Sequence, residues 1–190
     1  MELYEQQDYI RPFRLSEEFL EEYKTRKPDF GFNGLGELTY RRTYSRINPE
    51  GGKEEWWQTI RRVIEGVYTL QKKWIINNSL GWDNAKSQKS AKEMYERMFS
   101  MKFLPAGRGL WAFGTPLTEE KGLYLALNSC AMVTTENIKE ETAKPFCFLM
   151  DASMLGVGVG FDTKGSGKLS INSPNKESKE IYKITDDREG

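Results

Sequence analysis

Apolar and polar positions follow a helical period over residues 54–74. The apolar side chains recur at alternating steps of four and three residues, at Trp56, Ile60, Val63, Val67, Leu70 and Trp74. Steps of this size place side chains on one face of an α-helix, so the pattern predicts a long helix that packs through that face. A second helix is predicted over residues 87–101. Its packing face carries Ala91, Met94, Tyr95, Met98 and Met101.

A shorter helix is predicted to begin near Leu15. Ser16 suits the N-cap, acidic residues follow in the first turn, and Leu15 can pack on Leu20 as a hydrophobic staple. This helix is expected to end near Lys27 and Pro28.

The next segment is rich in glycine and aromatic residues. It covers residues 30–38 and leads into residues 39–44, for which we expect an extended or irregular chain. Gly51 and Gly52 then mark a turn.

The helical period is lost at Phe103. Pro105 and three glycines follow closely, and this composition indicates a boundary between a mostly helical region, residues 1–102, and a second region, residues 103–190.

The second region alternates strands and a helix. Residues 127–134 and 157–162 suit buried strands, and residues 142–155 suit a helix with Pro145 in its first turn. Residues 164–167 are expected to form a flexible turn, and residues 172–179 a polar loop.

Charge and apolar content narrow the function classes. Lys plus Arg and Asp plus Glu both number 28, and no long one-signed block offers the footprint of a duplex-binding protein. The apolar runs fall far short of the roughly 20 residues of a membrane-spanning helix. The first residues lack the apolar centre of a signal peptide. We therefore expect a cytoplasmic protein that binds neither nucleic acid nor membranes.

The chain contains no histidine and two cysteines. Ser/His/Asp and Cys/His nucleophilic catalysis are therefore excluded. Two cysteines alone rarely hold zinc, so no metal site is predicted. Because structural disulfides are rare in the cytosol, any function of these thiols is expected to be redox turnover.

Cys130 lies inside the first predicted strand, between Ser129 and Ala131. A lone cysteine is most often a small buried hydrophobe, and a redox thiol is the alternative. Two neighbouring segments favour the redox thiol, although each of them has a structural explanation of its own.

The first segment, residues 103–111, combines Pro105 with Gly107 and Gly109. Such a turn can present main-chain N–H groups to a phosphate, or it can serve as a tight connection between a helix and the next layer.

The second segment, residues 156–161, places glycine at alternate positions of a predicted strand. This pattern leaves one face of the strand bare, either for a flat ligand or for a closely packed helix. It is not a dinucleotide-binding fingerprint, because the glycines of that motif follow a strand and open a helix.

Taken in order, these segments resemble the catalytic subunit of ribonucleotide reductases, in particular the monomeric adenosylcobalamin-dependent (class II) ribonucleoside triphosphate reductases. The similarity extends from about Tyr40 to Phe161. It is carried by TYRRTY (39–44), VIEG (63–66), LPAGRGLW (104–111), NSC (128–130), PFCFLMD (145–151) and GVGVGF (156–161). Several motifs in family order are far more specific than any one of them.

The resemblance implies an α/β fold, in which an N-terminal helical region is followed by the first strands and helix of a ten-stranded α/β barrel that this chain leaves incomplete. It implies reduction of ribonucleotides to 2′-deoxyribonucleotides by radical chemistry, with a cysteine pair as reductant. Cys130 matches the first redox cysteine of the family. Replacing C2′–OH by C2′–H consumes two electrons, which a dithiol supplies and a thioredoxin-type reductant restores.

The resemblance also implies substrate contacts. Ser129 and the turn of Pro105, Ala106 and Gly107 match positions that contact the nucleotide, the turn through its phosphates. Gly158 and Gly160 match the glycine strand that lines the same pocket.

Cys147 lies on the predicted helix at a position where the family has no redox cysteine. It is therefore interpreted as a packing residue, and a Cys130–Cys147 disulfide is the lesser alternative.

Other parts of the family's machinery have no counterpart in residues 1–190: the radical-bearing cysteine, the second redox cysteine and most of the adenosylcobalamin surface. Because an open barrel leaves unpaired strand edges, we expect a complementary C-terminal polypeptide to complete it, whether the gene is split or the chain is a fragment. The other expected partners are the ribonucleotide and a thioredoxin-like reductant.

Two further interpretations stay open. The chain could be a non-catalytic nucleotide-binding or regulatory module descended from the family, which would tolerate the loss of Cys130. It could also be an assembly subunit that only completes the fold.

Overall fold

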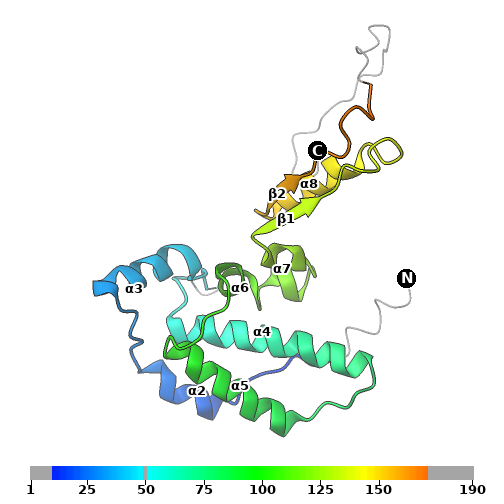
Figure 1. The fold of residues 1–190 in the computed structure, drawn as a ribbon. Coiled ribbons are helices and arrows are strands. Elements are labelled where there is room, and N and C mark those ends of the chain that lie inside the picture. The colour runs from blue at the N-terminus through cyan, green and yellow to red at the C-terminus, as the bar shows by residue number, and fades with distance from the viewer. Residues whose placement is uncertain (1–9, 49–50, 171–190) are drawn as a thin grey trace.

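The structure is a computed structural model that describes residues 10–48 and 51–170. Its first part is helical: α2 (Glu17–Lys24), the 3-10 turn η2 (Phe32–Gly34), α3 (Leu35–Thr39), the π-helix η3 (Tyr40–Tyr44), α4 (Trp56–Asn77), α5 (Asn84–Phe99), α6 (Gly107–Ala112), α7 (Pro116–Glu119) and the 3-10 turn η4 (Tyr124–Leu127). The second part is β1 (Cys130–Val133), α8 (Lys144–Met154) and β2 (Gly158–Phe161). Figure 1 shows the β1–α8–β2 unit standing away from the paired helices α4 and α5, with α6 and α7 between them.

The long helix predicted over residues 54–74 is confirmed as α4. Glu55 and Gln58 form a capping box at its start, in which each side chain bonds the other residue's backbone N–H. The N-terminal half of the apolar face is buried, with Ile60 fully enclosed. The C-terminal half of that prediction was wrong, because Trp74 is 60% exposed. The adjacent first turns of α5 are polar, so they offer this end of the face no apolar cover.

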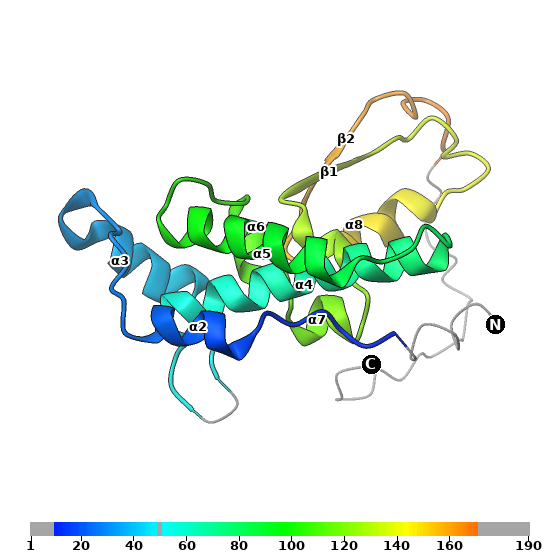
Figure 2. The same ribbon diagram turned by 90° about the horizontal axis from the view of Figure 1, so that it is seen from below.

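The second long helix is confirmed as α5, which lies antiparallel to α4 (Figure 2). Trp56 near the start of α4 donates from Nε1 to the Phe99 carbonyl at the end of α5, at 3.2 Å. Tyr68, three turns along α4, bonds Ser90 near the start of α5, at 2.7 Å. The predicted packing residue Tyr95 is fully buried.

The hydrophobic core lies between α2, α4 and α5, and aromatic rings fill much of it. The centroid of the Tyr23 ring lies 4.8 Å from that of Tyr95 and 4.9 Å from that of Phe99, and both pairs have edge-to-face geometry. Leu15 and Leu20 are buried in the same core. These contacts fix the helical part as one packed body.

Ser16 occupies the predicted N-cap of α2, but its side chain makes no capping hydrogen bond. The predicted cap was therefore wrong in its chemistry. The acidic first turn is held differently, because Glu17 forms an ion pair with Arg61 of α4. The helix start is thus fixed by a contact with another helix.

Residues 39–44 are helical, so the predicted extended or irregular chain was wrong. Threonine and tyrosine favour strands by propensity, but here Tyr40 is buried against the Phe30 and Trp56 rings, at 5.3 and 5.0 Å between centroids. Its hydroxyl donates to the Glu54 carbonyl at 2.9 Å. Tertiary packing therefore overrides local preference.

The predicted turn at Gly51 and Gly52 is confirmed. Both glycines have positive φ, and the Asn48 N–H donates to the Gly52 carbonyl at 3.0 Å. Ile47 and Lys53 pair across the turn in an antiparallel bridge.

The segment after Phe103 is more regular than predicted, because Gly107–Ala112 form helix α6. The helix packs on α4. A close backbone approach allows this packing: a Cβ added to Gly66 of α4 would lie 2.5 Å from the Gly114 nitrogen. Gly114 itself has a φ of +69°, a conformation that favours glycine.

The predicted strand–helix–strand order is confirmed, but the prediction that the strands are buried was wrong, because neither β1 nor β2 contains a buried residue. Pro145 stands in the first turn of α8 as expected. Strand β1 is shorter than residues 127–134 because Tyr124–Leu127 form a 3-10 turn. The strands are parallel and adjacent, and they form a two-stranded sheet within residues 10–48 and 51–170. The ten-stranded barrel stays a prediction.

The predicted turn at residues 164–167 is confirmed, whereas the loop predicted at residues 172–179 lies outside the described residues. Among the helices that the structure describes, none is long and apolar enough to cross a membrane.

Candidate active site

Cys130 opens strand β1, and Gly158 opens strand β2 directly beside it. The register pairs Cys130 with Gly158 and Met132 with Gly160. The Gly158 N–H donates to the Ser129 carbonyl at 3.0 Å. The structure therefore brings together four of the predicted site residues, the cysteine, the serine and the two strand glycines.

The face of the sheet that carries Cys130 is open. Side chains alternate along a strand, so Cys130 and Met132 share this face with Gly158 and Gly160. Met132 is 72% exposed, and Cys130 is exposed as a free thiol. Helix α8 packs on both strands with Ala152 buried. Cys130 is thus not a small hydrophobe sealed in an apolar core.

The two strand glycines have room for a side chain. A Cβ at Gly158 would lie 3.7 Å from the Ser129 carbonyl oxygen, and one at Gly160 would lie 4.0 Å from the Ala131 carbonyl oxygen. Both are ordinary contacts with the neighbouring strand, so no helix within the described residues requires these glycines. Their bare face leaves room for a flat ligand.

The predicted phosphate turn, Pro105 to Gly107, leads into α6. The Gly109 N–H donates to the Ala106 carbonyl at 2.8 Å, so Ala106 is the N-cap. Tyr44 of η3 closes on the turn, because a Cβ at Gly107 would lie 2.8 Å from the tyrosine Oη. A side chain at this position would force the Tyr44 ring to move. The first amides of a helix have no intrahelical acceptor, which suits them to bind an anion.

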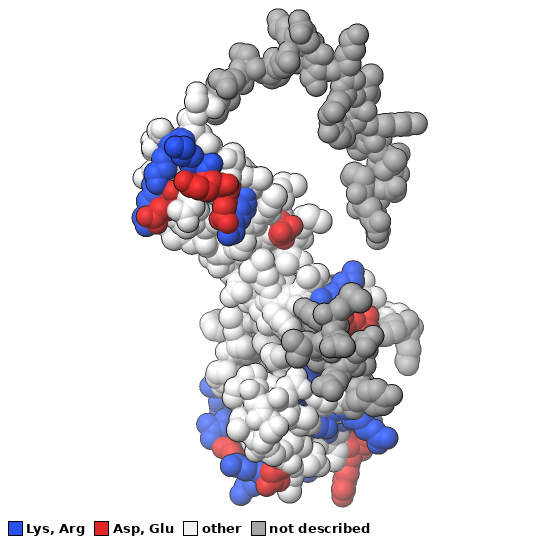
Figure 3. Space-filling view, turned by 90° about the vertical axis from the view of Figure 1, so that its right-hand side faces the viewer, with Lys and Arg blue, Asp and Glu red and all other residues white. Residues whose placement is uncertain are grey.

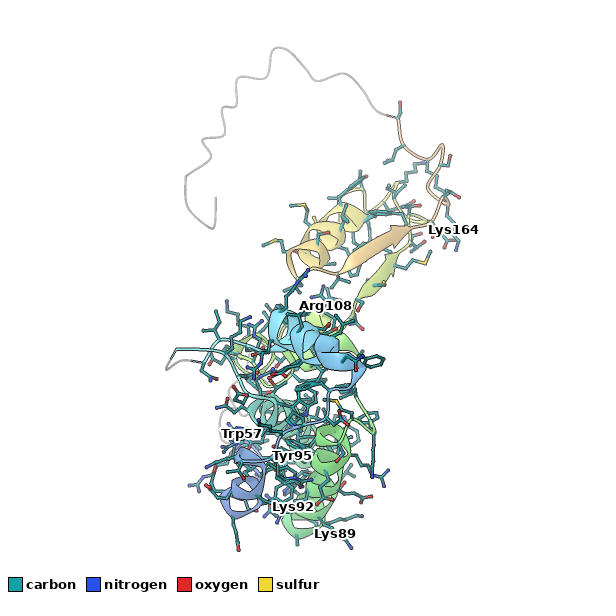
Figure 4. The ribbon with its side chains drawn as sticks, turned by 90° about the vertical axis from the view of Figure 1, so that its left-hand side faces the viewer. Trp57, Lys89, Lys92, Tyr95, Arg108 and Lys164 are labelled. Carbon is teal, nitrogen blue, oxygen red and sulfur yellow. The ribbon has the colours of Figure 1, made fainter. Side chains whose placement is uncertain are left out.

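Arg108 connects this turn to the glycine strand, a role that the sequence did not predict. Its Nη1 donates to the Leu155 carbonyl at 3.2 Å, and its Nη2 donates to the Gly156 carbonyl. The guanidinium carbon lies 5.5 Å from the centre of the Trp111 ring. Figure 4 shows Arg108 where the helical part meets the β1–α8–β2 unit. The one sequence feature that could have indicated this role is the position of Arg108 directly after Gly107 of the predicted turn.

Arg62 of α4 holds the opposite end of α6. Its Nη2 donates to the Leu110 carbonyl at 3.0 Å, and its Nη1 donates to the Phe113 carbonyl. The same guanidinium forms a two-point ion pair with Glu54, at 2.8 and 3.1 Å. The side chains of Arg62 and Glu54 are only 12% and 9% exposed. A buried ion pair therefore sets the position of the helix that carries the turn.

Glu54 also bonds Thr59, whose hydroxyl donates at 2.7 Å, and the backbone N–H of Arg46, at 3.4 Å. Burial alone would raise the pKa of Glu54. The hydrogen bonds and positive charge of Arg62, together with the Thr59 hydroxyl, outweigh burial, so the net pKa lies below the ordinary value. Glu54 is thus an ionised hub between η3, α4 and, through Arg62, α6.

The motif at residues 63–66 has a structural role, because its side chains and backbone contact the segments that pack on α4. Glu65 accepts the Leu15 N–H at 3.1 Å and a hydrogen bond from Arg61 at 3.1 Å. Burial raises the pKa of Glu65, and the nearby arginines only partly oppose this rise. Gly66 provides the close approach to Gly114. These residues hold the N-terminal segment and α6 against α4.

Asp162 ties the far ends of the two strands together. It accepts hydrogen bonds from the Thr134 hydroxyl at 2.6 Å and from the Thr135 N–H and hydroxyl at 2.9 and 2.7 Å. These bonds hold the pKa of Asp162 well below its usual range. Charged side chains, among them the Lys164–Glu136 ion pair, gather over this end of the unit (Figure 3).

Cys147 is exposed, so its interpretation as a packing residue was wrong. Helix α8 buries Pro145 and Ala152. Those two positions lie on one side of a helix, and Cys147 lies about 200° around the axis from Pro145. Cys130 and Cys147 are both free thiols in the structure.

The cavities of the described helical part include two that bear on the location of the site. One, of about 210 Å³, lies between α4 and α7 and includes Glu65 and Glu119. The other, of about 450 Å³, lies beside the end of α2 and includes Lys24 and Trp57. None of the predicted substrate-binding residues lines either cavity. The open sheet face therefore remains the candidate site.

Comparison with known proteins gives a consistent assignment. Residues 15–115 match the model of the ribonucleotide reductase alpha domain. A probable adenosylcobalamin-dependent ribonucleoside-triphosphate reductase of Dictyostelium discoideum is 55% identical over 85% of this chain and 21% of its own length. An adenosylcobalamin-dependent ribonucleoside-triphosphate reductase of Euglena gracilis is 46% identical over 94% of this chain and 25% of its own length.

A solved structure is also similar. The crystal structure of a B-12 dependent (class II) ribonucleotide reductase superposes with a TM-score of 0.65 and 31% identity, over 78% of this chain and 22% of that one. The chain thus spans about a fifth to a quarter of the length of the relatives that it matches. Because the family match covers more than half of its residues, this chain belongs to the ribonucleotide reductase alpha family.

Proposed function

We propose that this chain is the N-terminal part of a reductase that converts ribonucleoside triphosphates, or diphosphates, to 2′-deoxyribonucleotides. In this proposal it acts only together with the remaining segment of the barrel. The observation that carries the proposal is the position of Cys130, an exposed thiol paired in register with Gly158 on a bare sheet face. The names of the similar proteins support the substrate class.

The proposed redox step balances with two thiols. The ribonucleotide C2′–OH bond breaks and a C2′–H bond forms. Two thiols lose their hydrogens and join as a disulfide, and the oxygen leaves as water. Cys130 supplies one thiol, and the second comes from the segment outside this chain. A thioredoxin-type dithiol then reduces the disulfide by thiol–disulfide exchange.

The other residues of the site bind and orient the nucleotide. The turn of Pro105, Ala106 and Gly107 binds its phosphates through the backbone N–H groups of Ala106 and Gly107, because proline has no N–H to donate. Ser129 contacts the substrate beside the thiol. Gly158 and Gly160 let the nucleotide lie flat against the sheet, because no side chain projects there.

The complementary segment supplies the rest of the barrel. Both strands of the described sheet have an edge that no other described strand covers, and uncovered edges favour pairing with further strands. The similar proteins are about four to five times as long as the stretch they share with this chain. We propose that the segment carries the radical-bearing cysteine and the second redox cysteine.

Adenosylcobalamin is the proposed cofactor, on the names of the similar proteins. When bound, it supplies the radical that starts the reaction. We propose that the complementary segment holds most of the cofactor.

The proposal is tested by replacing each cysteine in the complete reductase. Cys130→Ser should abolish dithiol-driven turnover while the complementary segment still binds. Cys147→Ser is the matched control, because it removes the other exposed thiol of the described residues, and it should leave turnover unchanged. Full turnover by Cys130→Ser would reject the catalytic role and favour a non-catalytic binding or assembly module.

A further inference from the structure

A second feature of the site is a pair of arginines that contact one tryptophan. The guanidinium carbon of Arg46 lies 4.7 Å from the centre of the Trp111 ring, and that of Arg108 lies 5.5 Å from it. Both distances are within the range of cation–π attraction. Trp111 lies on α6, one turn after Arg108, so its ring supports the arginine on the same helix.

This arrangement is anchored in the helical part. The Arg46 N–H donates to Glu54, which forms the buried ion pair with Arg62. Contacts therefore run without interruption from α4 through Arg46 and Trp111 to Arg108. The Arg108 side chain is fixed in position, because its guanidinium lies against the Trp111 ring and donates to two backbone carbonyls.

The guanidinium of Arg108 reaches the residues just before the glycine strand. It donates to the carbonyls of Leu155 and Gly156, which lie three and two residues before Gly158. A Cβ at Gly156 would lie 2.7 Å from Arg108 Nη2, so the contact is tight. Gly158 in turn bonds Ser129 and pairs with Cys130. Arg108 thus links the phosphate turn to the strand beside the thiol.

We propose that Arg108, supported by Trp111, is a positioning residue that fixes the spacing between the phosphate turn and Cys130. This inference rests on the proposed function. A nucleotide held by its phosphates at the turn presents its ribose to the thiol only when that spacing is correct. Lysine cannot replace the arginine fully, because a point charge lacks the planar fork that reaches two carbonyls at once.

The first test measures steady-state kinetics of the complete reductase that contains residues 1–190. Arg108→Lys and Arg108→Gln should lower kcat by about tenfold or more, since a misplacement of about 1 Å can cost about 100-fold. The KM for the ribonucleotide should stay within about threefold, because the turn itself is intact. Arg97→Gln is the control, since it removes an arginine from an exposed ion pair on α5.

The second test measures hydrogen–deuterium exchange in the 190-residue chain, which requires no turnover. Arg108→Gln should speed exchange at the Gly158 amide by about tenfold, because the start of β2 loses its anchor, while the α4 amides should not change. Normal kcat, or a raised KM with normal kcat, would overturn the positioning role, as would unchanged exchange at Gly158. Failure of the unmutated reductase to form deoxyribonucleotide would instead reject the proposed function.

Discussion

The buried Glu54–Arg62 ion pair should be one of the most sensitive points of the helical part. Replacing Glu54 by Gln leaves the Arg62 charge in a site where only about a tenth of either side chain is exposed. Breaking a buried pair from one side costs about 3–5 kcal/mol. Because Arg62 keeps the carbonyls of Leu110 and Phe113 as acceptors, we expect a value near the lower end, about 3 kcal/mol.

A double-mutant cycle separates the pair from its surroundings. Glu54→Gln, Arg62→Met and the double variant are unfolded in urea, and tryptophan fluorescence and circular dichroism report the transition. Removing both partners leaves no unpaired buried charge. The double variant should therefore lose about 2 kcal/mol less than the two single variants together.

The exposed Glu93–Arg97 pair on α5 provides a matched control. These side chains are 59% and 62% exposed, so their coupling energy should stay below about 0.5 kcal/mol. A coupling energy for Glu54 and Arg62 no larger than that of the control would refute the claim that this pair holds α6 in place.

Three further outcomes follow from the contacts described. Gly66→Ala should lower Tm, because a Cβ 2.5 Å from the Gly114 nitrogen forces overpacking of about 1–3 kcal/mol, more than the gain of about 1 kcal/mol in helix propensity; a raised Tm would contradict the contact. The folded pKa of Glu54 lies below its ordinary value, so its stabilisation is present above the unfolded-state pKa and lost as pH falls through the folded pKa; the difference in unfolding free energy between wild type and Glu54→Gln should shrink as pH falls through that range in urea titrations, and a constant difference would contradict the shift. Asp162→Asn should speed exchange of the Thr135 amide, seen by NMR, because a charged acceptor is lost; unchanged exchange would contradict the claim that Asp162 ties the ends of the two strands together.

The parts of the fold that follow from local pattern were predictable. The long apolar period of the sequence predicts helix α4. Pro145 marks the first turn of α8, and glycine marks the boundary between α8 and β2. The bare face of β2 was also predictable, because glycine recurs at alternate positions of the strand, whereas its place beside Cys130 was expected only from the family resemblance.

The remaining features depend on contacts between distant residues. Tyr40 forms part of a helix because Phe30 and Trp56 bury its ring, and no local propensity records that burial. Trp74 continues the apolar period of α4 yet is exposed. This exposure was not predicted, because the sequence pattern of one helix does not show where the neighbouring helix becomes polar.

The contacts of Arg108 were hidden for the same reason. The arginine stands in a recognised motif, but its acceptors are backbone carbonyls 47 and 48 residues away. Backbone groups carry no sequence signature, so only the fold reveals that contact.

The most direct test of the central claim is a single turnover of the pre-reduced complete reductase without external reductant. The amount of deoxyribonucleotide and the oxidation state of each cysteine are measured together by mass spectrometry. We expect about one equivalent of product per active site, with Cys130 recovered in a disulfide and Cys147 still a thiol. A full equivalent of product from Cys130→Ser, or product formed while Cys130 remains reduced, would contradict the account.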